Sequence, residues 1–310
     1  MEVANDKDSE FNVIKKNLVF YRLLIMKKFF LSIWNEFVYG GHLLSIGGSA
    51  IVLTVILIFD FSLEFGINLI VATYLILQII YGYNHYSEAA FDLLTNPERA
   101  KHYSGSQKKF WIGFVIYSLA LLAALWQFPL IATLLILFML SGGILFTTFF
   151  KSLTQRIIGF KSFYTSFFWA LLVPLTFVYY GKALNEGAII LSAFVFIRWL
   201  LNTIFFDIKD MVADRNMRLK TFPVMIGREQ TISLLHVLNI LSIVPLVFGL
   251  LWGDIAKDSG ALLVIIFLSL YYLWFSVKSS IRQLRVLSYI VVDGEYLLWP
   301  LLVLLMKVTL

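Results

Sequence analysis

Nine long apolar stretches dominate the 310-residue sequence, and they restrict the folds that the chain can adopt. Each is at least 17 residues long, which is enough for a helix to cross the hydrocarbon core of a bilayer. They are Leu43–Phe59, Ile67–Tyr83, Phe110–Trp126, Leu130–Phe146, Ser162–Tyr180, Ala188–Phe206, Ile232–Leu251, Ala261–Val277 and Val286–Met306. The hydrocarbon core holds no water to bond an open backbone, so stretches of this length indicate transmembrane helices.

The composition excludes an ordinary soluble domain. Hydrophobic residues make up 60% of the chain and charged residues only 14%, against roughly 45–50% and about 25% in soluble domains. The absence of cysteine also excludes a disulfide scaffold, a thiolate metal site and a thiol nucleophile. We therefore predict an all-α polytopic membrane protein.

The N-terminal segment differs from the rest of the chain. Its first ten residues are polar and acidic, so we expect no cleaved signal peptide. Val13–Phe37 then mixes Lys and Arg with large apolar side chains, which is typical of an amphipathic helix on the membrane surface; the alternative is that it extends the first span. We predict two parts: a cytoplasmic N-terminal segment at 1–40 and a nine-helix transmembrane domain at 41–310.

Positive charge alternates between the loops. If the N-terminus is cytoplasmic, 21 of the 25 Lys and Arg residues lie on that side of the nine predicted spans. The positive-inside rule therefore predicts a cytoplasmic N-terminus and an outside C-terminus, in a multi-pass protein of the cell inner membrane. This arrangement explains the net charge of +6 by anionic lipid, with no need for nucleic acid as a partner.

Two acidic stripes stand at the cytoplasmic ends of the second and sixth predicted spans. The first is Asn84, Glu88 and Asp92, spaced i, i+4, i+8, and the second is Asp207, Asp210 and Asp214, spaced i, i+3, i+7. Each spacing puts its side chains on one helix face. Clustered carboxylates repel one another, and Mg²⁺ relieves that repulsion because it prefers oxygen ligands and phosphate. We interpret the stripes as a site for a Mg²⁺-bound diphosphate; the alternative is two solvated helix ends paired with neighbouring cations.

Several cations are further candidates. Lys151, Arg156 and Lys161 form a basic cluster that either binds phosphate or contacts lipid head groups. Arg198 lies inside a predicted span, where a cation indicates a functional site by default. Its partner is either a site carboxylate or substrate, or else Asp293 or Glu295 in a structural pair. Those two carboxylates either orient an acceptor or act as a base. The alternative is that their side chains only extend to the membrane–water interface.

Both stripes extend into longer motifs that carry a family resemblance. Asn84-x3-Glu88-x3-Asp92 with the following Asn96-Pro97-Glu98-Arg99 resembles the first motif of the UbiA-type intramembrane prenyltransferase family. Asp207-x2-Asp210-x3-Asp214, followed by Lys220-Thr221-Phe222-Pro223-Val224 and Gly227, is similar to its second motif. The first motif departs from the pattern, because His85 and Glu88 stand where the family usually has Asp.

The resemblance implies nine helices around a central cavity and transfer of an isoprenyl chain from a polyprenyl diphosphate to a lipophilic acceptor, as in lipid or quinone biosynthesis. It implies that ionisation of the allylic diphosphate needs Mg²⁺. The metal ligands it implies are Asn84, Glu88, Asp92, Asp207, Asp210 and Asp214. The diphosphate contacts expected are Arg99, Lys151, Arg156, Lys161, Arg198 and Lys220, with Asp210, Asp214 and Lys220 as the catalytic residues.

Two other functions stay open on the sequence. A terpene cyclase on the same scaffold would ionise the same diphosphate without a separate acceptor. A non-enzymatic transporter would use Arg198, Asp293 and Glu295 along a transport path. Neither the acceptor nor the prenyl chain length follows from the sequence.

Overall fold

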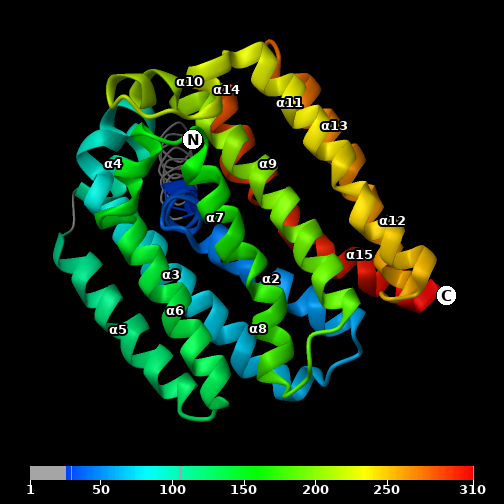
Figure 1. The fold of residues 1–310 in the computed structure, drawn as a ribbon. Coiled ribbons are helices and arrows are strands. Elements are labelled where there is room, and N and C mark those ends of the chain that lie inside the picture. Colours follow the sequence, from blue (N-terminus) through cyan, green and yellow to red (C-terminus); the bar gives the residue numbers. More distant parts are fainter. Residues whose placement is uncertain (1–25, 29, 105–106, 310) are drawn as a thin grey trace, which may run out of the picture.

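Helices account for all of the regular secondary structure in residues 26–28, 30–104 and 107–309, which are the residues that the computed structural model describes (Figure 1). In this part of the chain, seven helices are long and apolar enough to cross a membrane. There are eight if Met26–Tyr39 and His42–Ile58, which meet at 57°, form one bent span. The predicted span at residues 110–126 is the short apolar helix Phe110–Leu125. All nine apolar stretches are thus helical, but seven or eight, rather than nine, have the length to span.

The structure contains fourteen labelled α-helices and three other helical segments in the described part of the chain. The α-helices are α2 (His42–Ile58), α3 (Leu63–Thr95), α4 (Pro97–Ser104), α5 (Gln107–Leu125), α6 (Leu130–Thr148), α7 (Phe160–Ala170), α8 (Leu172–Tyr179), α9 (Glu186–Asn216), α10 (Phe222–Ile226), α11 (Arg228–Leu241), α12 (Ile243–Trp252), α13 (Val264–Ser276), α14 (Ile281–Val286) and α15 (Glu295–Thr309). Three further segments are η1 (Phe150–Gln155), η2 (Lys257–Leu263) and the π-helical η3 (Leu287–Val292).

Two long helices position the predicted motifs. Both α3 and α9 continue past the apolar stretch that begins them, so their polar C-terminal turns project from the same bundle. The helix α9 packs against α7, α8, α10, α11 and α12, while α3 packs against α2, α4, α5 and α6. Figure 1 shows α9 running through the bundle beside α7.

Glycines let the helices around the cavity approach closely. A Cβ atom added to Gly48 of α2 would lie 2.1 Å from the Leu77 side chain of α3. One added to Gly143 of α6 would lie 2.6 Å from the Ile80 side chain of α3. Small residues at helix contacts are the usual means of close packing in a membrane.

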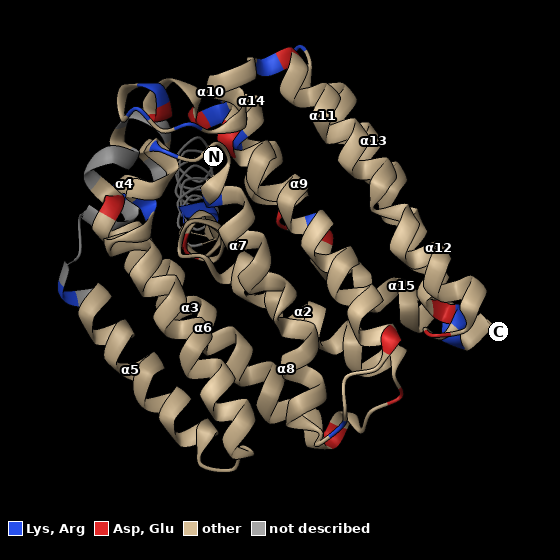
Figure 2. Cartoon of the chain, in the orientation of Figure 1, with Lys and Arg blue, Asp and Glu red and all other residues tan. Residues whose placement is uncertain are grey.

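The outer surface fits a bilayer. Large apolar side chains such as Leu119, Leu122 and Ile131 are more than half exposed along the helices, as expected where lipid covers them. Charged residues gather at the end of the bundle where α4, α10 and α14 lie (Figure 2). These features identify a multi-pass membrane protein. Of the predicted amphipathic segment Val13–Phe37, residues 26–28 and 30–37 are helical and the rest lies outside the described residues.

Candidate active site

A central cavity of about 230 Å³ lies between α2, α3, α6, α7 and α9. One end is charged, and we call it the charged end; it is lined by Glu88, Arg99, Lys151, Lys161, Lys209, Asp210 and Asp214. The remaining wall is largely apolar and aromatic, with Leu77, Met139, Phe146, Phe168 and Leu172 among its residues. The cavity therefore joins a cluster of ionic groups to an apolar chamber, all within the bundle.

The last turns of α9 bring the second acidic stripe to this cavity. Asp210 and Asp214 both line it, one helical turn apart. Asp210 accepts from the Lys209 ammonium at 2.8 Å and from the Asn96 amide at 3.5 Å. Asp214 accepts from the Thr221 hydroxyl at 3.1 Å. These two carboxylates are consequently held by neighbours while still facing the cavity.

Asp207 has a different position. Its side chain is fully buried and is not part of the cavity wall. One carboxylate oxygen pairs with the Lys161 ammonium at 2.6 Å, and the other accepts from the Ser162 hydroxyl at 3.3 Å. Asp207 was predicted to be a metal ligand. In the structure it instead binds Lys161, and it is the Lys161 side chain that reaches the cavity.

The end of α3 brings the first stripe to the opposite wall. Asn84 and Glu88 line the cavity, with Asn84 accepting from the Thr147 hydroxyl at 3.2 Å. Glu88 pairs with the Lys151 ammonium at 2.6 Å. Asp92 belongs to α3, but its side chain lies outside the described residues.

Three of the predicted diphosphate contacts line the cavity, namely Arg99, Lys151 and Lys161. Arg156 is instead exposed, and Lys220 donates to its backbone carbonyl at 3.3 Å. Neither residue belongs to the cavity wall.

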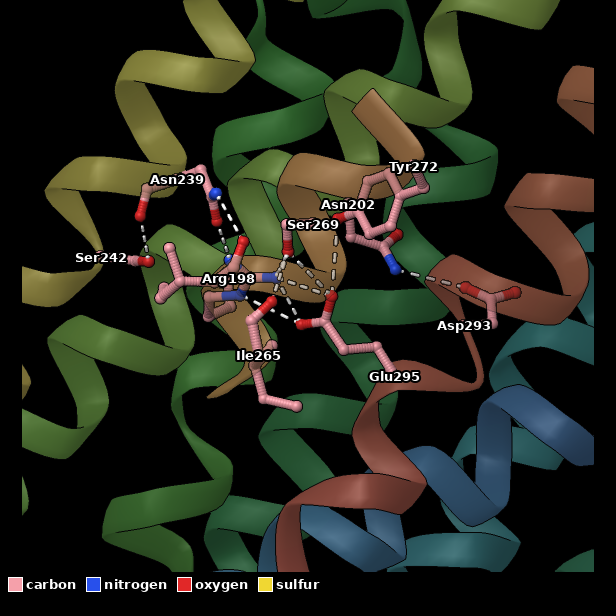
Figure 3. Close-up of polar contacts among 10 residues, drawn as sticks. Arg198, Asn202, Asn239, Ser242, Ile265, Ser269, Tyr272, Asp293 and Glu295 are labelled. Atoms are coloured by element: carbon pink, nitrogen blue, oxygen red, sulfur yellow. Dashed lines mark hydrogen bonds and ion pairs between the residues drawn. The ribbon is translucent and has the colours of Figure 1, made fainter. Parts of the chain in front are cut away.

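Arg198 also lies away from the cavity wall, and its side chain is 1% exposed. It pairs with Glu295 at 2.5 Å and donates to the Asn239 carbonyl at 2.7 Å and the Ser269 hydroxyl at 2.5 Å (Figure 3). These partners are all side chains of the protein. The structure therefore contains the alternative pair with Glu295, and the expected contact between Arg198 and diphosphate has no support in this geometry.

Lys209 and Tyr289 also line the cavity, although neither was predicted from the sequence as a site residue. The Lys209 ammonium is almost fully buried and donates to the Asn96 carbonyl at 3.1 Å, while Tyr289 donates to the same oxygen at 2.6 Å. A usable signal for Lys209 is its place inside the acidic stripe, directly before Asp210. Tyr289 carries no comparable signal, because η3 brings it to α4 from 193 residues away.

The fit to Mg²⁺ depends on the donor groups. In the described part of the chain, no three acidic or histidine side chains are grouped closely enough to form a ready metal site. Three carboxylates instead pair with lysine, as Glu88, Asp207 and Asp210 do. Asn84, Glu88, Asp210 and Asp214 nevertheless offer only oxygen to one cavity, and Mg²⁺ needs few protein ligands when phosphate and water complete its shell. The donor set therefore fits Mg²⁺ with a diphosphate.

Comparison with known protein families identifies the family of this chain. The UbiA prenyltransferase family model matches residues 49–289, and the chain belongs to this family. It is therefore a prenyltransferase. A comparison with curated protein sequences finds no match.

Solved structures share the fold at low sequence identity. A UbiA homologue from Aeropyrum pernix K1, in its apo form, is 13% identical, has a TM-score of 0.65 and covers 86% of this chain and 96% of its own. A UbiA homologue from Archaeoglobus fulgidus bound to DMAPP and Mg²⁺ is 13% identical with a TM-score of 0.63, covering 87% and 98%. A structure of digeranylgeranylglyceryl phosphate synthase is 10% identical with a TM-score of 0.57, covering 89% and 98%.

Proposed function

We propose that this prenyltransferase moves an isoprenyl chain from a polyprenyl diphosphate to a lipophilic acceptor inside the membrane, in a Mg²⁺-dependent reaction. The observation that carries the proposal is the central cavity, which joins the charged end to an apolar chamber. A diphosphate needs the cations of the charged end, and an isoprenyl chain needs the apolar chamber. The Archaeoglobus fulgidus homologue, described as bound to DMAPP and Mg²⁺, supports the same pairing of ligands.

Four side chains with oxygen donors would hold the metal. Asn84 and Glu88 approach from α3, and Asp210 and Asp214 from α9. When bound, Mg²⁺ supplies neutralisation of the charge that develops on the departing diphosphate. Asp207 does not take part directly, because it is buried behind Lys161.

The basic residues bind and orient the diphosphate. Lys151, Lys161 and Lys209 each pair with one carboxylate in this structure, and Arg99 lies beside them in the cavity wall. A bound diphosphate would offer these four cations new oxygen partners, and Mg²⁺ would neutralise Glu88 and Asp210, the carboxylates that pair with Lys151 and Lys209 in the structure. The charge of the site therefore stays balanced on binding, which favours the ternary complex over either ligand alone.

The apolar chamber protects the reacting carbon from water. Phe146, Phe168 and Leu172 offer apolar surface for an isoprenyl chain. The aromatic rings of Trp169 and Trp199, which also line the cavity, stack with centroids 3.4 Å apart. Trp199 is stacked between Trp169 and Tyr296, so these rings form a packed wall that helps to exclude water from the reacting carbon.

The charge distribution supports a membrane orientation for the same proposal. The charged loops at the α4, α10 and α14 end (Figure 2) belong on the cytoplasmic side by the positive-inside rule. The diphosphate, which is water-soluble at its head, would then enter from the cytoplasm. The inner membrane of the cell is the location that we propose.

Diphosphate release tests the proposal directly. The full chain, purified in detergent, would receive geranylgeranyl diphosphate with and without Mg²⁺ and with a panel of lipophilic acceptors. We expect release that needs Mg²⁺ and an acceptor, and its loss in Asp210→Asn. The matched control is Glu186→Gln, which removes a carboxylate from the opposite end of the same helix. Mg²⁺-independent release, or full activity in Asp210→Asn, would contradict the proposal; acceptor-free release of a cyclic product would assign a cyclase instead.

A further inference from the structure

One carboxylate in the cavity wall has no role in the site described so far. Asp293 follows η3 directly, lines the cavity and is 5% exposed. One of its oxygens accepts a hydrogen bond from the Asn202 amide at 3.3 Å (Figure 3). Among the described residues, its side chain makes that one hydrogen bond and no ion pair. A buried carboxylate with so few partners is energetically unfavourable unless a ligand completes its bonding.

Glu295, two residues further along the chain, is also buried, but both of its carboxylate oxygens have hydrogen-bond partners. Arg198 contacts both of its oxygens, at 2.5 and 2.6 Å. Ser269 and Tyr272 add contacts at 3.4 Å each. Figure 3 shows this group facing Arg198, while Asp293 lies apart from that network and directs one oxygen towards Asn202. Asp293 alone of these two carboxylates therefore has an oxygen left for a ligand in the cavity.

The place of Asp293 along the cavity separates it from the diphosphate. Its partner Asn202 precedes Asp210 by eight residues on α9, which is about 12 Å along the helix axis at 1.5 Å per residue. The aromatic residues Tyr81, Trp169 and Trp199 line the cavity with it. A diphosphate bound at the charged end would direct its first isoprenyl carbons towards this level. That is where the nucleophilic atom of an acceptor has to lie.

We propose that Asp293, held in place by Asn202, binds the acceptor through an O–H group on that acceptor. This inference rests on the proposed function and adds the class of acceptor: a lipophilic molecule whose hydroxyl is close to the atom that becomes prenylated. The carboxylate accepts the hydroxyl hydrogen bond, which completes its own bonding. An acceptor that placed a carboxylate or phosphate here would meet the like charge of Asp293. Asn202 is a positioning residue, and Asp293 determines specificity.

A pair of small probes tests this with no knowledge of the natural acceptor. The probes are 2-naphthol and 2-methoxynaphthalene, which differ in the O–H donor. Their affinities would be measured by fluorescence on the full chain in detergent, with Mg²⁺ and geranylgeranyl S-thiolodiphosphate, an analogue that resists ionisation. For the unaltered chain we expect 2-naphthol to bind about tenfold more tightly, since hydrogen bonds to charged groups are the strong ones.

Variants of Asp293 test whether its carboxylate causes the preference for 2-naphthol. In Asp293→Leu we expect the ratio of the two affinities to fall to about one, and in Asp293→Asn to an intermediate value. The second variant keeps the hydrogen bond with Asn202 and guards against a folding defect in the first. The matched control is Thr203→Val, because Thr203 lines the same part of the cavity and its hydroxyl donates to the Leu200 carbonyl. The control should keep the tenfold preference.

The outcomes separate this inference from the proposed function. Equal binding of the two probes to the unaltered chain, or a preference that survives in Asp293→Leu, would overturn the inference. Loss of thiolodiphosphate binding in both Asp293 variants would also overturn it, by showing a structural role. Failure of the unaltered chain to bind the thiolodiphosphate in a Mg²⁺-dependent way would count against the proposed function, and the probe ratio would still decide the role of Asp293.

Discussion

Two charged regions of the helix α9, its middle and its C-terminal end, differ in how completely their charge is bonded. Near its middle, Arg198 is surrounded by Glu295, Asn239 and Ser269, all of them buried. At its C-terminal end, Asp210 and Asp214 have protein partners on one side and the cavity on the other.

This difference separates a structural charge from a functional one. A buried ion pair with every donor matched holds helices together and leaves nothing for a ligand. A carboxylate that faces a cavity can exchange a protein partner for a ligand. The sequence places Arg198 inside a span and the aspartates at the cytoplasmic end of that span, and both positions indicate function, so only the partners distinguish the two roles.

The largest effect should come from the structural region. Glu295→Gln leaves the Arg198 cation buried without a counter-charge, which we expect to lower the free energy of unfolding by about 3–5 kcal/mol. Thermal or denaturant unfolding in detergent measures this. The control Tyr272→Phe removes only a 3.4 Å contact and should have a much smaller effect. Unchanged stability in Glu295→Gln would show that the network does not hold the bundle.

Substitutions at the C-terminal end of α9 should lower the rate of diphosphate release rather than the stability. Asp214→Asn removes a charge that faces the cavity, and we expect Mg²⁺-dependent diphosphate release to fall by about two to three orders of magnitude. Stability should change little, because the amide can still accept from Thr221. Glu229→Gln, an exposed carboxylate in the first turn of α11, is the control. A variant with full activity would remove Asp214 from the metal site.

A basic residue of the charged end should show a smaller and more specific effect. Lys151→Gln removes the ammonium that pairs with Glu88 and faces the cavity. We expect the KM for geranylgeranyl diphosphate to rise about tenfold, as for the loss of one charge-assisted hydrogen bond. Steady-state kinetics across diphosphate concentrations would measure it, and an unchanged KM would place the diphosphate elsewhere.

The smallest effect is expected outside the cavity. Arg156→Gln alters an exposed side chain of the same predicted basic cluster, so its KM should change less than about twofold. The contrast with Lys151→Gln sharpens the boundary of the site. An equal rise in both KM values would extend the diphosphate site to the exposed loop.

The sequence predicted the fold class and the elements that carry the site. Apolar length and charge placement were sufficient for an all-helical membrane protein, and the i, i+4 and i, i+3 spacings correctly placed Asn84, Glu88, Asp210 and Asp214 on faces that reach one cavity. Local periodicity settles which residues of a helix share a face.

Partners that come from distant parts of the chain could not be predicted. Asp207 shares the spacing of its neighbours, but Lys161 and Ser162 from α7 cover it. Arg198 finds Glu295 97 residues away, a pairing that the sequence left open beside three others. Helix packing decides these contacts. It also decides the number of full-length spans, because one or two of the nine apolar stretches do not form a helix of spanning length.

An experimental structure with geranylgeranyl S-thiolodiphosphate and Mn²⁺ in place of Mg²⁺ would test the central claim most directly. The anomalous signal of Mn²⁺ locates the metal, and the diphosphate follows from density. We predict metal and diphosphate at the charged end, in contact with Asp210 or Asp214 from α9 and with Asn84 or Glu88 from α3, and an isoprenyl chain in the apolar chamber. Metal or diphosphate bound at Arg198, or outside the cavity, would contradict the account.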